Sequence, residues 1–143
     1  MIDVGAKADT QREAVAEGAI KMSPGTVALV HNSTLPKGNA LETARVAAIM
    51  AAKGTSTVIP LCHPLLLTHV SCQFECDPEA GTIRVETRVR CTGKTGVEME
   101  ALTAAAIALL TIYDMTKGVD SNLEIQHVRL LEKRGGKSDV LRV

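Results

Sequence analysis

A carboxylate and an amine whose types suit proton transfer stand at the end of a long apolar segment. Asp114 follows residues 101–113, which carry no charged side chain, and Lys117 lies three positions further on. The apolar segment predicts a helix, and the partial negative charge at a helix C-terminus favours a lysine and disfavours a carboxylate. A surface ion pair therefore explains Lys117 better than Asp114. We interpret Asp114 as a candidate acid or base with a perturbed pKa, because such groups concentrate at reactive sites.

Two further carboxylates begin the same helix. Glu98 and Glu100 stand at its predicted N-terminus, where the helix dipole stabilises acids, so a purely structural role stays open. The alternative is that they face a ligand. Positions two apart on a helix differ by roughly 200° in direction, which predicts that at most one of the two enters any single pocket.

Cys62 and His63 lie between two prolines in the stretch IPLCHPL. Neighbours in an extended segment point to opposite sides, which argues against a Cys–His nucleophilic pair. Cys72 and Cys76, about 13 Å apart in a predicted strand, argue against a zinc site. We expect a rigid loop that presents His63 as a proton donor or hydrogen-bond partner, the alternative being that His63 serves only the loop backbone.

Basic side chains occur in three other places: Lys37 in PKGN, Lys53 at the end of a helical pattern, and the stretch EKRGGKSD. The last contains GGKS but lacks the glycine spacing and the strand–turn–helix context of a phosphate loop. Its glycine backbone, together with Lys133, Arg134 and Lys137, remains a candidate for phosphate binding.

Hydrophobic periodicity predicts the elements that must position these residues. They are a strand in residues 12–22, a short helix in 23–30, a helix in 40–54, a stiff loop in 56–65, a hairpin of strands 66–76 and 82–91, a helix ending at Gly118 and a strand in 123–133. The spacing of Thr10 and Glu13 also fits a helix capping box, which leaves a helix as the alternative for the first strand. The order β-α-β-β-α-β predicts an α+β fold, a ferredoxin-like sandwich with an antiparallel sheet and helices on one face.

The composition limits the class of protein. A chain of 143 residues predicts a single domain, residues 1–143, and its formal net charge of zero argues against a nucleic-acid partner. Phe74 and Tyr113 are the only aromatic residues, too few to stack bases as an RNA-recognition domain does. The first residues are unlike a signal peptide, and no apolar run reaches the roughly 20 residues of a membrane span. We therefore expect a cytoplasmic protein with reduced cysteines, a small-molecule partner and no membrane.

The apolar segment also predicts self-association. Residues 101–112 have no polar stripe, whereas a helix on one sheet needs only one apolar face. An exposed apolar stripe of that size is unusual on a monomer, so we expect a homo-oligomer.

Several motifs together resemble one enzyme family. The stretches DVGAK, KGNALETARVAAIMAAK, IPLCHPL, TGVEMEALTAAAIALLTIYDM and VRLLEKRGGKS, between Ile2 and Ser138, resemble the cyclic pyranopterin monophosphate synthase family of molybdenum cofactor biosynthesis. The resemblance implies a lyase that converts 3′,8-cyclo-7,8-dihydro-GTP into cyclic pyranopterin monophosphate and releases diphosphate. It also implies a homohexamer, a trimer of dimers, with active sites at subunit interfaces. The alternative is a ferredoxin-like regulatory module that binds a nucleotide without turning it over.

The resemblance implies roles for particular residues. The catalytic residues would be Asp114, Lys117 and Lys37, and the substrate-binding residues Leu61, Cys62, His63, Glu98, Met99, Glu100, Arg12 and Lys53. No cofactor or metal ligand set is implied, although Mg²⁺ could accompany the triphosphate. Asn39 stands where the family usually has Asp, and Asp139 where glycine is common.

The spacing of two candidates predicts where the site is built. Glu100 and Asp114 are fourteen positions apart, which is about 21 Å on one straight helix. If both act on one small substrate, the site joins the start of this helix in one subunit to its end in another.

Overall fold

The computed structural model describes residues 1–142 and contains one antiparallel sheet with helices packed against it. In chain order, the elements are β1 (Thr10–Lys21), α1 (Pro24–His31), α2 (Ala40–Lys53), α3 (Thr55–Val58), β2 (Leu67–Asp77), β3 (Thr82–Gly93), α4 (Glu98–Thr116), β4 (Glu124–Arg134) and β5 (Val140–Leu141). The long elements follow the predicted β-α-β-β-α-β order.

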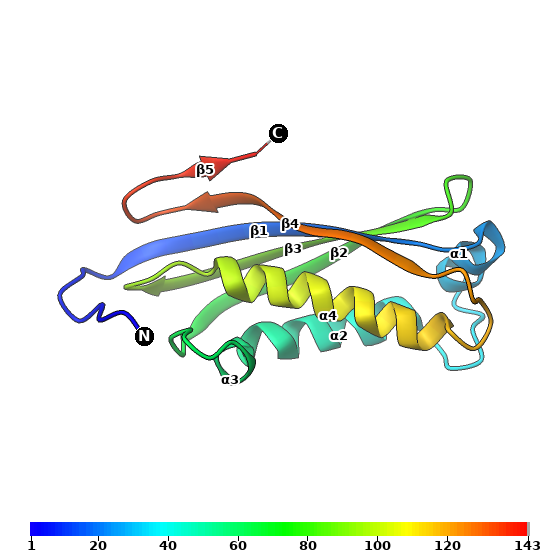
Figure 1. The fold of residues 1–143 in the computed structure, drawn as a ribbon, viewed down its shortest axis with the longest axis horizontal. Coiled ribbons are helices and arrows are strands. Elements are labelled where there is room, and N and C mark those ends of the chain that lie inside the picture. The colour runs from blue at the N-terminus through cyan, green and yellow to red at the C-terminus, as the bar shows by residue number, and fades with distance from the viewer. Residues whose placement is uncertain (143) are drawn as a thin grey trace.

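The strands lie in the order β2-β3-β1-β4-β5, and each neighbouring pair is antiparallel. Figure 1 shows α2 and α4 along one face of this sheet, where they also pack against each other. This arrangement is consistent with a ferredoxin-like sandwich, and it confirms the predicted α+β class.

Local differences from the expected elements have simple causes. The capping-box alternative at Thr10 is wrong, because β1 runs unbroken from that residue. The stretch predicted as a loop begins with the short helix α3, which ends at Ile59 because a residue before proline prefers an extended backbone. A fifth strand follows β4, since Gly135 and Gly136 both adopt positive φ and turn the chain back.

Small side chains let the two long helices approach the sheet closely. Buried alanines occupy the core-facing positions of both helices: Ala40, Ala44, Ala48 and Ala52 in α2, and Ala101, Ala104, Ala105 and Ala108 in α4. Gly18 of β1 lies directly against Leu109, and a Cβ at that position would come within 2.6 Å of Leu109 Cδ1. This close packing fixes both ends of α4 relative to the sheet.

The helix α4 is long and apolar enough that its composition alone would suit a membrane span. Its packing in the core accounts for that composition. Leu109 and Ile112 are fully buried, and Thr87 of β3 donates a hydrogen bond to the Ala101 carbonyl over 2.8 Å. Charged residues stand near both of its ends, at Glu98 and Asp114. These ends carry the candidate site residues.

Candidate active site

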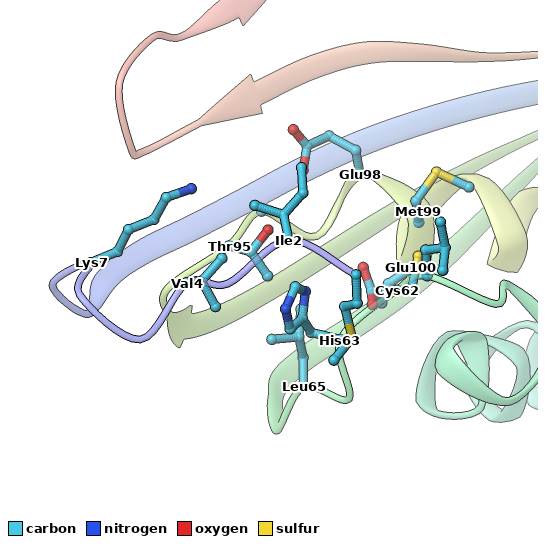
Figure 2. Close-up of a pocket in the computed structure, with 13 residues that line it drawn as sticks. Ile2, Val4, Lys7, Cys62, His63, Leu65, Thr95, Glu98, Met99 and Glu100 are labelled. Carbon is cyan, nitrogen blue, oxygen red and sulfur yellow. The ribbon is translucent and has the colours of Figure 1, made fainter.

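A pocket of about 500 Å³, which we call the first pocket, lies at the N-terminal end of α4 (Figure 2). It is formed by the start of α4, the loop after α3 and the first residues of the chain. Its lining includes Leu61, Cys62, His63, Met99 and Glu100. The fold therefore brings the two predicted substrate-binding segments, LCH and ME, together in one cavity.

The loop that carries Cys62 and His63 is shaped locally. The Cys62 amide donates to the Ile59 carbonyl over 3.2 Å, and flanking prolines restrict the backbone on both sides. Burial and the nearby Glu100 carboxylate both raise the pKa of the Cys62 thiol. Cys62 is therefore a protonated wall of the pocket, which agrees with the argument against a nucleophilic role.

Glu100 is the most unusual polar group of the first pocket. Its side chain is 4% exposed, and its Oε2 atom has no hydrogen-bond partner among the described residues. Burial raises the pKa of this carboxyl group, and the neighbouring charge of Glu98 adds to the effect. A buried acceptor without a partner is costly in a folded protein, so a bound ligand that donates to Glu100 would satisfy it.

The prediction that only one of the two acids enters a pocket is wrong as stated, because both Glu98 and Glu100 line the first pocket. The pocket wraps around the helix end, so it reaches two directions at once. The side chains still diverge: Figure 2 shows Glu98 pointing away from the loop that carries Cys62 and Glu100 lying beside that loop. Glu98 Oε1 is 2.6 Å from Lys133 Nζ of β4.

A second cavity of about 410 Å³, which we call the basic pocket, adjoins the first. The two share Lys7, Thr95, Gly96 and Glu98 in their linings. The charged residues of the basic pocket are Lys7, Arg12, Lys94, Lys133, Lys137 and Glu98. Five cations face one acid there, which makes the basic pocket a strong candidate for binding phosphates.

The GGKS stretch contributes to the basic pocket, but not with every residue expected. Lys133, Gly136 and Lys137 line it. Gly136 packs directly on the Arg12 guanidinium, where a Cβ would clash, and so glycine is required there. Arg134 instead pairs with Glu132, because alternate residues of a strand point to opposite faces, and it takes no part in this pocket.

The three predicted catalytic residues form a cluster at the other end of α4. Lys37 Nζ is 2.9 Å from Asp114 Oδ2, and Lys117 Nζ is 2.8 Å from Asp114 Oδ1. The hydrogen bonds from Lys117 and Lys37 lower the pKa of Asp114 to about 2, and the bond to Asp114 raises the pKa of Lys117. The pKa of Asp114 is therefore perturbed as predicted. The two lysines, rather than burial, are the cause.

The predicted site residues thus fall into two groups on one chain. Because α4 is unbroken between Glu100 and Asp114, its ends are about 21 Å apart. Arg12 reaches the basic pocket, whereas Lys53 is exposed at the end of α2 and lines neither cavity.

Sequence reasoning missed Lys94, Thr95 and the first residues of the chain. Lys94 and Thr95 belong to the stretch TGKTG, whose position directly before a long helix is a signal for anion binding. Among residues 1–142, no three His, Cys, Asp or Glu side chains come together in a group that could hold a metal ion.

Comparison with known proteins assigns the chain. A family model described as the MoaC family matches residues 1–136. The chain belongs to the MoaC family. A cyclic pyranopterin monophosphate synthase of Chloroflexus aurantiacus is 58% identical to this MoaC family member over 138 residues, which cover 96% of this chain and 85% of the relative. A protein of the same name from Brucella ovis is 55% identical over 138 residues, 96% of this chain and 84% of the relative.

Proposed function

We propose that this protein is the lyase that converts 3′,8-cyclo-7,8-dihydro-GTP into cyclic pyranopterin monophosphate and diphosphate in molybdenum cofactor biosynthesis. The names of its relatives support this activity. The observation that carries the proposal is the union of the first pocket with the basic pocket, which suits a ring system joined to a triphosphate. A regulatory module that only binds the nucleotide is not favoured by the family.

The two pockets divide the substrate between them. The ring system would lie in the first pocket, where its N–H groups would satisfy the unpartnered Glu100 Oε2. The triphosphate would lie among Lys7, Arg12 and Lys133, whose charges offset those of the phosphates. Glu98 would lie at the junction and hold Lys133 in place through the ion pair between them.

The reaction needs proton transfers and one phosphate ester exchange. In the exchange, a hydroxyl oxygen of the sugar-derived part bonds to the α-phosphorus, the bond to the β-phosphate bridging oxygen breaks, and diphosphate leaves with its charge balanced by lysines. The hydroxyl proton passes to a base. Asp114, Lys117 and Lys37 would serve the proton transfers, each typically contributing about 10² to 10⁴ in rate.

We propose that each site combines two subunits, one giving the pockets and the other giving the Asp114 cluster. The length of α4 supports this, because one chain holds these groups at its opposite ends. A surface for pairing exists on the helices: Val46 and Met50 of α2 are each 61% exposed, and Leu110 of α4 is 52% exposed. Contiguous exposed apolar side chains of this kind mark association surfaces. A trimer of such dimers would give the homohexamer that the resemblance implies.

The remaining expectations also stand as proposals. We propose that residues 1–143 work as a single domain in the cytoplasm, with no nucleic-acid or membrane partner. The single sheet and the four free thiols support this assignment. We also propose that the protein holds no resident cofactor, and that any Mg²⁺ enters with the triphosphate as part of the substrate. Activity that persists after dialysis against a chelator, and depends on Mg²⁺ only at the level of substrate affinity, is the expected result.

The decisive experiment is incubation of the purified protein with the cyclised nucleotide, followed by measurement of diphosphate and of the cyclic phosphate product. We expect equal amounts of both. Folded protein that binds the nucleotide but releases no diphosphate would favour the regulatory module instead. Sedimentation should show an oligomer, and a strictly monomeric profile would contradict the two-subunit site.

A further inference from the structure

Residues 1–9, which we call the strap, run across the first pocket before β1 begins. Met1, Ile2, Val4 and Lys7 all line that pocket, and Figure 2 shows Ile2 and Val4 over the loop that carries His63. Ile2 is nevertheless 78% exposed. The strap therefore covers the pocket without being packed into the core.

A single side chain ties the strap to the rest of the protein. Lys94 Nζ donates to the Gly5 carbonyl over 3.2 Å and to the Lys7 carbonyl over 2.5 Å. The other hydrogen bonds found in residues 1–9 are local to the strap: the Lys7 amide bonds to Val4, and the Gly5 amide to the Asp3 carboxylate. The position of the strap thus depends on one ammonium group.

That ammonium group also belongs to the phosphate-binding part of the site. Lys94 lines the basic pocket, and its own carbonyl accepts a hydrogen bond from Arg12 Nη2 over 3.2 Å. A lysine has three N–H donors, and the strap uses two of those of Lys94. The third is available for a phosphate oxygen. Lys7, within the strap itself, faces the same cavity.

We propose that the strap is a lid on the first pocket and that Lys94 couples its closure to the triphosphate. This inference rests on the proposed function. An anion in the basic pocket fixes Lys94 and attracts Lys7, and both hold the strap down over the ring system. The closed strap excludes water, which would otherwise compete with the substrate hydroxyl for the α-phosphorus. Departure of diphosphate removes the anion and loosens the strap.

The first test measures strap opening directly. Trypsin cleaves after lysine, so the rate of cleavage between Lys7 and Ala8 reports the open population. Lys94→Met should raise this rate about fivefold to tenfold, because two hydrogen bonds from a charged donor are lost. Lys21→Met is the matched control: its ammonium group also donates to a backbone carbonyl, that of Ala80, over 2.9 Å, far from both pockets. The control should cleave at the wild-type rate.

Inorganic triphosphate tests the coupling. It should slow cleavage after Lys7 in the wild type and in Lys21→Met, but not in Lys94→Met, whereas Lys94→Arg should restore part of the protection. Equal cleavage rates for the wild type and Lys94→Met, with and without triphosphate, would overturn the lid.

Kinetics separate a lid from simple phosphate binding by Lys94. If Lys94 acts through the strap, its effect and that of Ile2→Ala on kcat/KM are not additive, and the double variant is no worse than Lys94→Met alone. Additive losses would show that Lys94 binds phosphate independently of the strap and would overturn its positioning role. The ligand-free cleavage rates do not depend on turnover. A wild type that fails to release diphosphate would therefore count against the proposed function and leave the test of the strap intact.

Discussion

Lys37 Nζ lies 2.9 Å from Asp114 Oδ2, although 77 positions separate the two residues in the sequence. Lys37 also donates to the backbone carbonyl of Asp114, so it satisfies the end of α4 and its carboxylate together. Lys117 occupies the other carboxylate oxygen. The acid at the unfavourable end of the helix is thus stabilised by two ammonium groups, which it in turn orients.

The first prediction concerns Asp114→Asn. The change keeps the shape of the side chain but removes the charge that positions both lysines, so kcat should fall by about 10² to 10⁴ while KM changes little. Steady-state release of diphosphate measures both constants. Glu42→Gln is the control, because Glu42 forms an exposed ion pair with Arg45 on α2, and its kcat should stay near the wild-type value. Wild-type turnover by Asp114→Asn would remove Asp114 from the mechanism.

The second prediction concerns the alkaline limb of the pH–rate profile. The bond to Asp114 raises the pKa of Lys117, so Lys117 stays protonated to a higher pH than an ordinary lysine. Where the reaction needs that proton, kcat/KM falls only above the raised pKa. In Asp114→Asn this support is lost, and the alkaline limb should move to lower pH. An unchanged limb in the residual activity of the variant would show that Lys117 is not the group that titrates.

The third prediction concerns Glu100→Gln. Burial raises the pKa of Glu100 in the folded protein, so its carboxylate lowers the free energy of unfolding at pH values above that raised pKa, and the penalty disappears below the unfolded value of 4.5. The variant should therefore be as stable as the wild type or more stable at neutral pH, yet bind substrate more weakly. Thermal unfolding at pH 4 and pH 8, together with KM, tests both parts. A large loss of stability with unchanged KM would assign Glu100 a purely structural role.

The fourth prediction concerns Asp120, which follows α4 and caps α1. Its carboxylate accepts hydrogen bonds from the Ser23 amide and the Thr26 hydroxyl, both over 2.8 Å, and from the Asn122 amide. Burial opposes ionisation, but these hydrogen bonds outweigh it and lower the pKa to about 2.

Asp120→Asn should therefore cost about 2 kcal/mol of the free energy of unfolding at neutral pH. A depressed pKa means that this contribution is complete above the unfolded value of 3.8 and is lost as the pH falls towards about 2. Chemical denaturation at pH 7 and pH 3 checks the sign. Asp77→Asn, which changes an acceptor in the exposed β2–β3 turn, is the control and should cost well under about 1 kcal/mol. A cost for Asp120→Asn that is independent of pH would point to lost packing instead.

The long elements were predictable because each has a local signal. The alternation in β1 and the hairpin, and the strong helix formers of α2 and α4, decide those elements without tertiary information. The strand β5 was not predictable, since two residues carry no periodicity and their pairing depends on the turn at Gly135 and Gly136.

The site was predictable only in part, for a related reason. Asp114, Glu100 and His63 stand out by type and position. Lys94 and Lys7 do not, because a lysine in a loop is ordinary until the fold places it beside a cavity. Likewise, the partnership of Lys37 with Asp114 depends on how α2 and α4 pack, which no local pattern specifies.

The last prediction tests whether one site draws on two subunits. Glu100→Gln and Asp114→Asn should each yield oligomers with little activity. If the pockets come from one subunit and the Asp114 cluster from its partner, a mixed dimer contains one site with both groups intact. Random pairing of equal amounts then restores about a quarter of the wild-type sites. Co-expression of two differently tagged variants, followed by isolation of the mixed oligomer and measurement of diphosphate release, provides the number.

The control for that experiment uses two changes within one group. Lys37→Met and Asp114→Asn alter the same cluster, so a mixed oligomer carries one defect in every site that the cluster serves and should remain inactive. Recovery in the first mixture and none in the second is the pattern that only a shared site produces. No recovery in either mixture, from oligomers shown to contain both variants, would mean that Glu100 and Asp114 act from the same chain. The unbroken length of α4 makes that result incompatible with one small substrate that both residues touch.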